Sequence, residues 1–246
     1  MKQKIFFIAL LCAGCTLVSY GQRKPNNQVT TKPAQSTTAQ RPNSRAATAA
    51  SSNRNGAIER LPEFEKSGGK PFMDVLRDRE TIPSLQREPL QPEQLSQLLW
   101  VACGATTPEN YTAFKVTQTQ CVEMYYINEH GIYRYDRDLH ELSSIRRGQF
   151  THLLMGNDEF SVDAAAAVFF VFKPGEISAD GRRPVTEVEA AINCGAIMQN
   201  IALYCSSVDM LSCLPINFSD AHKAELLKAI NREESMVLYG MVIGRR

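Results

Sequence analysis

The sequence predicts an α+β domain, on three observations. The stretch from Thr186 to about Ser206 opens with a helix-capping signal, and its apolar residues nearly encircle the helix, which is typical of a central helix. Residues 122–135 form two strand-like runs around a turn, and Val168–Phe172 and Met236–Ile243 are continuously apolar, as buried strands are. Because these helices and strands do not alternate strictly, a mixed α+β fold is favoured.

The first elements of this domain follow from turn and capping residues. A helix is expected from Pro92 to Gly104, because proline favours the first helical turn and glycine ends helices. Its apolar residues recur at helical spacing: Leu95, Leu98, Leu99 and Ala102. The strand Val122–Ile127 leads through the turn Asn128–Gly131 into a second strand, so this region is predicted to be a hairpin. The polar segment Asp138–Arg147 is expected to form a short helix.

The later elements carry sharper boundary signals. In the capping box, the Thr186 hydroxyl can accept a hydrogen bond from the amide of Glu189 while the Glu189 carboxylate reaches back. Ser219 is expected to cap a further helix over Ala221–Ile230. The apolar run Met236–Ile243 is then expected to be the closing strand of the sheet.

The first 21 residues have the pattern of a signal peptide. Lys2 and Lys4 precede a short apolar run that is too short for a stable membrane span. Ser19 and Gly21 then place small residues at positions −3 and −1 of a cleavage before Gln22. We therefore expect residues 1–21 to be removed on export.

A second processing route stays open at this point. Ala13-Gly14-Cys15 resembles the end of a bacterial lipobox, with Cys12 where an aliphatic residue usually stands. This route would place a lipid anchor at Cys15. Both routes predict an exported chain that works in the periplasm or in association with the cell envelope.

The charge is distributed unevenly between three segments. Residues 1–21 carry +2, residues 22–60 carry +6 and the remainder carries −7, from 18 basic and 25 acidic residues. Residues 22–60 contain almost no large apolar side chain, so we expect a disordered, basic linker. Residues 61–246 form the predicted folded domain, whose net negative charge argues against a nucleic-acid partner.

The reactive side chains form no recognisable catalytic or metal-binding pattern. The five cysteines that follow the predicted cleavage site show no metal-ligand spacing and are expected to be mostly buried thiols: Cys103, Cys121, Cys194, Cys205 and Cys213. The four histidines are scattered, and no serine is flanked by glycines as in a nucleophile elbow. We therefore predict no catalytic side chain and no metal ligand.

Several short sequence motifs, and the order in which they occur, resemble those of the flavin-dependent nitroreductase family. They are Phe72–Ile82, Leu95–Trp100, Gly131–Asp136 and Cys194–Leu203, followed by the closing strand that runs into Gly244. The chain is most similar to the bacterial branch that includes the azoline (thiazole- and oxazole-forming) dehydrogenases. The resemblance covers roughly residues 70–246, and it rests on the order and spacing of these motifs taken together.

This resemblance implies a fold, a cofactor and an assembly. The fold is a central, mostly antiparallel sheet flanked by helices, in a homodimer that holds FMN at the subunit interface. The isoalloxazine N5 would carry a hydride to or from an unknown small-molecule or peptide substrate, while the protein supplies position and electrostatics. The family requires no catalytic acid or base.

The resemblance also implies cofactor-binding residues, carried over position by position. In the opening motif, Arg79 and Thr81 match a basic residue and a hydroxyl that contact FMN. In the stretch 114–120, Gln120 is retained and Gln118 can replace the family's asparagine. Further candidates are Gln199, Asn200 and Arg245.

Three segments depart from the family pattern. Pro83 stands where a second basic residue is expected, most of 114–120 differs, and residues 208–211 replace a glycine-rich turn with bulky side chains and a carboxylate. These departures describe a divergent member. They leave a second function open, namely a non-enzymatic envelope module that keeps the fold and uses a degenerate cofactor cleft for binding.

Overall fold

The computed structural model describes residues 57–80, 88–116, 121–154, 164, 166–179, 181–208, 211–216 and 218–245. They belong to one compact unit, Ser52–Arg246. The predicted signal peptide, and the predicted linker up to residue 56, lie outside the described residues. Within the described part of the chain, no helix combines the length and the hydropathy that crossing a membrane requires.

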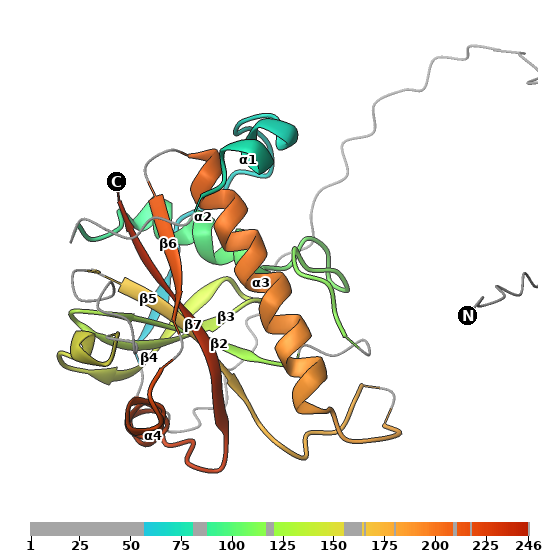
Figure 1. The fold of residues 1–246 in the computed structure, drawn as a ribbon, viewed down its shortest axis with the longest axis vertical. Coiled ribbons are helices and arrows are strands. Elements are labelled where there is room, and N and C mark those ends of the chain that lie inside the picture. Colours follow the sequence, from blue (N-terminus) through green and yellow to red (C-terminus); the bar gives the residue numbers. More distant parts are fainter. Residues whose placement is uncertain are drawn as a thin grey trace, which may run out of the picture. The chain divides into compact units, whose positions relative to one another are not determined.

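A seven-stranded sheet, in the order β1-β4-β3-β2-β5-β7-β6, forms the centre of the domain, and every neighbouring pair is antiparallel (Figure 1). The strands are β1 (Ile58–Arg60), β2 (Glu123–Asn128), β3 (Gly131–Asp136), β4 (Glu141–Arg147), β5 (Ala166–Phe172), β6 (Leu211–Ile216) and β7 (Met236–Arg245). The helices are α1 (Phe72–Asp78), α2 (Pro92–Cys103), α3 (Glu187–Ser207) and α4 (Asp220–Ala229), with a 3₁₀ turn η1 (Thr151–Leu154). The predicted α+β fold with an antiparallel sheet flanked by helices is confirmed.

Local capping chemistry sets the start of the long helix as predicted. The Thr186 hydroxyl accepts from the Glu189 amide at 3.3 Å, and the Glu189 carboxylate accepts from the Thr186 amide at 2.9 Å. The Arg183 guanidinium also holds this carboxylate, and together with the Thr186 bonds it lowers the pKa of Glu189 to about 2. The hairpin, β5, α2, α4 and β7 likewise lie where the sequence predicts them.

The predicted helix over Asp138–Arg147 is wrong, because Glu141–Arg147 forms strand β4. The side chain of Asp136 accepts from the amides of residues 138 and 139, and His140 adopts a left-handed φ of 51°. This turn reverses the chain onto β3. Strand β1 is formed by the last three residues of the predicted linker. Strand β6 lies where no strand is predicted from the sequence.

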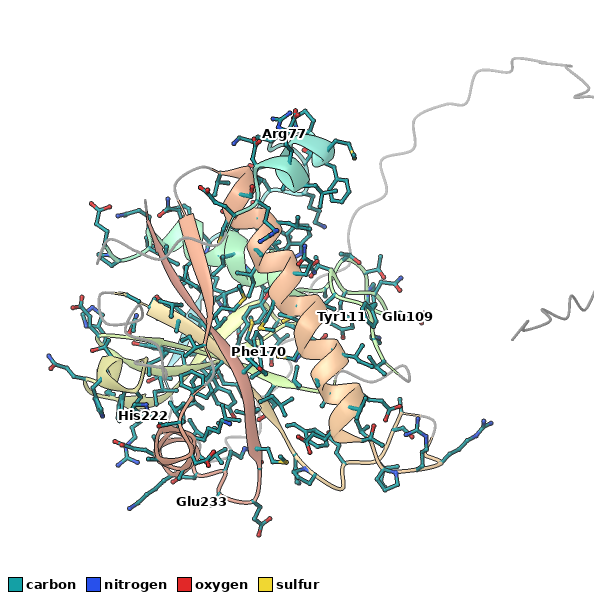
Figure 2. The ribbon with its side chains drawn as sticks, viewed as in Figure 1. Arg77, Glu109, Tyr111, Phe170, His222 and Glu233 are labelled. Carbon is teal, nitrogen blue, oxygen red and sulfur yellow. The ribbon has the colours of Figure 1, made fainter. Side chains whose placement is uncertain are left out.

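Alternating side chains of the sheet build two separate cores. Met124 of β2 packs in the core under α2 and α3, whereas its neighbour Tyr125 packs in the core under α4 and η1. In β5 the same alternation places Phe170, at the centre of Figure 2, toward α3 and Phe169 toward α4. The sheet is therefore covered on both faces by helices (Figure 1).

A hydrogen-bonded network around His140 fastens the start of the described domain. Nε2 of His140 lies 2.8 Å from Oγ of Ser96, which donates to the carbonyl oxygen of Pro62 at 2.6 Å. Since the Ser96 hydroxyl gives its one proton to Pro62, Nε2 carries the ring proton and Nδ1 accepts from the Tyr135 hydroxyl at 2.8 Å. The ring of Phe64 packs edge-on against His140, with 4.7 Å between ring centroids.

This network predicts acid sensitivity. Burial lowers the pKa of His140 from its usual 6.5, so the neutral ring is favoured in the folded state. The stability that His140 contributes is full above pH 6.5 and is lost as the pH falls through the lower pKa of the folded state. His140→Ala is expected to cost about 1–3 kcal/mol at neutral pH, because its hydrogen bonds are lost, and to reduce the acid sensitivity.

Urea unfolding at one pH above and one pH below 6.5 measures this effect. The control is His130→Gln, because His130 is exposed in the β2–β3 turn. Equal acid destabilisation of the wild type and His140→Ala would show that this histidine does not control the response.

Candidate functional site

The predicted site residues can be located relative to the two ends of the sheet. At the Arg245 end, β7 finishes and pairs with the start of β6, Leu211. At the Met236 end, β7 begins, and β2 begins at the same level because Val171 of β5 pairs with both Glu123 and Val237. Helix α3 leads from the segment after β5 to the start of β6, so it runs from the Met236 end to the Arg245 end (Figure 1).

Arg79 lies at the Arg245 end. It directly follows α1, which packs on the last turn of α3, where the Ser206 hydroxyl donates to the carbonyl oxygen of Val75 at 3.1 Å. The Arg79 side chain is exposed, and it makes no hydrogen bond or ion pair with other described residues. Its neighbour Arg77, in contrast, is paired with Asp74 at 2.8 Å. The Arg79 guanidinium is thus available to an anion.

The two predicted site residues on α3 have different surroundings. Gln199 is exposed. Asn200 is half-buried, and its amide donates to the carbonyl oxygen of Ala102 at the end of α2, at 3.4 Å. Asn200 also lines a cavity of about 550 Å³ between α1, α2 and α3. Part of its hydrogen-bonding capacity is therefore used to join two helices.

The remaining predicted contacts are only partly described. Thr81, Gln118 and Gln120 lie outside the described residues. Arg245 is the last residue of β7, where its backbone pairs with Leu211, and its side chain lies outside the described part.

Asn193 binds both flanks of the segment that contains Gln118 and Gln120. It is not among the site residues predicted from the sequence. Its side-chain oxygen accepts from the Cys121 amide at 3.2 Å, and its side-chain amide donates to the carbonyl oxygen of Phe114 at 2.9 Å. Asn193 is fully buried in the first half of α3. It therefore holds both flanks of the predicted flavin-lining stretch against the helix.

The described flank of the stretch that contains Gln118 and Gln120 lies far from Arg79 and Arg245. Cys121 and Val122 directly precede β2 at the Met236 end, whereas Arg79 and Arg245 lie at the opposite end. Eight residue steps along β7, from Val237 to Arg245, separate the two levels, which corresponds to about 27 Å. In Figure 2, Arg77 of α1 and Glu233, shortly before β7, mark the two ends.

Helix α3 leaves an uncovered stripe along its outer face. Val188, Ile192, Gly195 and Gln199 follow each other at helical spacing. Val188 is 68% exposed and Ile192 is 49% exposed, and a Cβ on Gly195 would meet nothing within 4 Å. We call these four residues the α3 stripe. Near its Gln199 end, α1 adds the exposed apolar residues Phe72, Met73 and Leu76. Several exposed apolar side chains on neighbouring helices are typical of an interface.

The four cysteines whose side chains the structure describes are not poised for nucleophilic chemistry, and the side chain of Cys213 lies outside the described part. Cys103, Cys121, Cys194 and Cys205 are buried, as the sequence predicts. Burial raises the pKa of Cys194 to about 12, so its thiol stays protonated at neutral pH. Within the described residues, no group of three or more histidine, cysteine, aspartate or glutamate side chains is arranged to hold a metal ion.

A central antiparallel sheet flanked by helices is the fold that the resemblance implies. A sequence model of the nitroreductase family matches residues 76–245, which is more than half of the chain. The chain therefore belongs to the nitroreductase family, whose members typically depend on FMN.

Solved structures agree on the fold. A structure from Ralstonia eutropha JMP134, described as a nitroreductase, is 26% identical, with a TM-score of 0.66 over 76% of this chain and 89% of that chain. The Escherichia coli microcin synthetase McbBCD complex with truncated pro-MccB17 bound is 16% identical, with a TM-score of 0.55 over 74% of this chain and 75% of that chain. A comparison with curated proteins found no match.

Proposed function

We propose that this chain is an exported flavin oxidoreductase that binds FMN as a homodimer and acts on a small-molecule or peptide substrate. Membership of the nitroreductase family supports the reaction class. One observation supports the homodimer. The α3 stripe is exposed, and it runs between the end of the sheet near Cys121 and the end near Arg79 and Arg245.

A two-fold axis through the middle of the α3 stripe would bring opposite ends of the two copies together. Symmetric dimers use the same surface patch on both copies, so the two α3 helices would pack antiparallel. The Val188 half of one helix would then face the Gln199 half of the other. This arrangement would bring the segment between Phe114 and Cys121 of one copy, whose two ends Asn193 holds against the first half of α3, toward Arg79 and Arg245 of the other copy.

The residues present suit FMN, because they include guanidinium groups that can bind its phosphate and side-chain amides that can bind the polar edge of its ring. The guanidinium of Arg79 would pair with the phosphate, supported by Thr81 and Arg245. Side-chain amides of Gln199 and Asn200 from one copy, and of Gln118 and Gln120 from the other, would bond the polar edge of the ring. When bound, the flavin supplies hydride transfer at N5, while these residues hold and orient it.

The export proposal rests on the predicted leader. Residues 1–21 have the signal-peptide pattern, and the predicted basic linker that precedes β1 would then separate the domain from the site of export or from a lipid anchor at Cys15. We accordingly propose a periplasmic or envelope-associated protein. The mass of the mature amino terminus distinguishes cleavage before Gln22 from lipidation.

A titration with FMN tests the cofactor proposal. Quenching of flavin fluorescence is expected on addition of the wild-type protein, and Arg79→Ala is expected to weaken binding by about 1.5–3 kcal/mol, because one charge-assisted contact is lost. The matched control is Arg146→Ala on β4, which removes an exposed guanidinium outside the proposed site.

Two results would count against parts of this proposal. Equal affinities for the wild type and Arg79→Ala would show that Arg79 does not contact the phosphate. Failure of the wild type to bind FMN at all would favour the non-enzymatic envelope module instead.

A further inference from the structure

A second cavity opens at the Met236 end of the sheet, and none of its described lining residues is one of the predicted flavin contacts. Its volume is about 540 Å³. The walls come from the loop after α2, the start of β2, the turn between β3 and β4, the segment after β5 and the segment before β7. Five chain segments thus converge around one polar space.

Arg137, from the β3–β4 turn, is the central feature of this cavity. Its Nη2 donates to the carbonyl oxygen of Val122 at 2.6 Å. Its Nη1 is buried, yet it has no hydrogen-bond partner within the described part of the chain. A buried donor without a partner is costly, so an acceptor that reaches Nη1 would be favoured.

The neighbouring carboxylates do not neutralise Arg137 in the described structure. Asp138 accepts from the hydroxyl of Tyr111 at 2.5 Å. Glu123 accepts from Arg134 at 3.5 Å and from Arg232 at 3.4 Å. Glu176 lines the cavity as well, and none of these three acids is paired with Arg137 among the described residues.

Two lysines add positive charge to the same walls. Lys115 is held in place, because its Nζ donates to the carbonyl oxygen of Glu109 at 2.7 Å and lies 4.6 Å from the centre of the Tyr111 ring. Figure 2 shows Glu109 and Tyr111 together on the loop beside α3. Lys173, just after β5, lines the cavity and forms no ion pair with other described residues. With Arg232, which is paired with Glu123, four cationic side chains therefore line a space that a small molecule can enter.

We propose that this cavity binds a small oxyanion, carried by an organic carboxylate or a phosphate compound, with Arg137 as its anchor. The planar guanidinium offers parallel N–H groups that match the geometry of such an anion. Lys115 and Lys173 contribute further attraction from the rim. The site is built from one chain alone, so it does not depend on flavin binding or on dimerisation.

Isothermal titration calorimetry of the full-length chain tests this site, with succinate and inorganic phosphate as probes and chloride at matched ionic strength as reference. Saturable binding is expected for at least one probe in the millimolar range or tighter. Tighter binding of succinate would indicate an organic acid as the ligand, and tighter binding of phosphate a phosphoryl compound.

Three variants locate the anion. Arg137→Gln is expected to weaken binding about tenfold or more, and Lys173→Gln about threefold, because the first removes a charge-assisted contact and the second a rim charge. Lys228→Gln on α4, exposed and outside the cavity, is expected to leave the affinity unchanged. Circular dichroism checks the fold of each variant.

The outcomes that overturn the site are distinct from those that concern FMN. Absence of saturable binding by either probe would overturn it, as would equal affinities for the wild type and a folded Arg137→Gln variant. Should Arg137→Gln fail to fold, the Lys173→Gln variant decides, and an affinity equal to that of the wild type would reject the proposal.

Discussion

Replacing Ile192 by arginine is expected to convert the protein from a dimer into a monomer and to abolish FMN binding. Ile192 is 49% exposed near the middle of the α3 stripe, so the isolated domain tolerates the change. In the two-fold assembly, however, the substitution would bury an unpaired guanidinium on each copy, which costs several kcal/mol. Because the proposed flavin contacts come from two chains, loss of the dimer removes the two contributed by the second copy, Gln118 and Gln120.

Light scattering coupled to size-exclusion chromatography measures the mass, and a fluorescence titration of the same fractions measures FMN binding. The control is Leu139→Arg, which places the same charge on a side chain 67% exposed in the β3–β4 turn. A dimeric Ile192→Arg variant would show that the α3 stripe is not the interface. A monomer that still binds FMN would show that one chain completes the site.

Gly240→Ala is expected to destabilise the domain by about 3 kcal/mol, near the upper range for overpacking in a core. A Cβ on Gly240 would lie 2.6 Å from the buried ring of Phe218 and 2.8 Å from the backbone oxygen of Val168 on the paired strand β5. Neither neighbour is the free end of a flexible chain, so β7 must move away from β5 or the aromatic core must repack.

Urea unfolding in the Ile192→Arg background measures this cost, because stability then does not depend on association. Gly195→Ala serves as the comparison, since its Cβ meets nothing within 4 Å and alanine favours a helix interior. That change is expected to stabilise the domain by about 0.5–1 kcal/mol. Equal effects of the two substitutions would contradict the packing described for β7.

The fold could be predicted from the sequence where the signals were local. The Thr186 and Glu189 capping box places the start of α3, and the continuous apolar runs place β5 and β7. Strand β4 was missed because its polar residues resemble an exposed helix, while its structure depends on pairing with β3 and on the turn at His140. Strand β1 was missed because its three exposed residues gain their conformation from β4.

The candidate site was less accessible to sequence reasoning. The opening motif predicts Arg79 as a cofactor contact, and the structure shows its side chain to be exposed. Nothing local, however, shows that Asn193 bridges Phe114 and Cys121 across more than 70 residues. The one available signal was a polar side chain on an inward position of an otherwise apolar helix. Arg137 was likewise missed, because its buried and unpaired nitrogen is a consequence of tertiary packing.

Sedimentation velocity of the wild-type chain with FMN, followed at the protein and flavin absorption bands together, tests most directly whether two copies build one flavin cradle. The expected result is that flavin absorbance sediments with a single boundary of dimer mass, at one FMN per chain. Flavin that stays unbound, or that sediments with a species of monomer mass, would contradict a site shared between two copies of the α3 stripe.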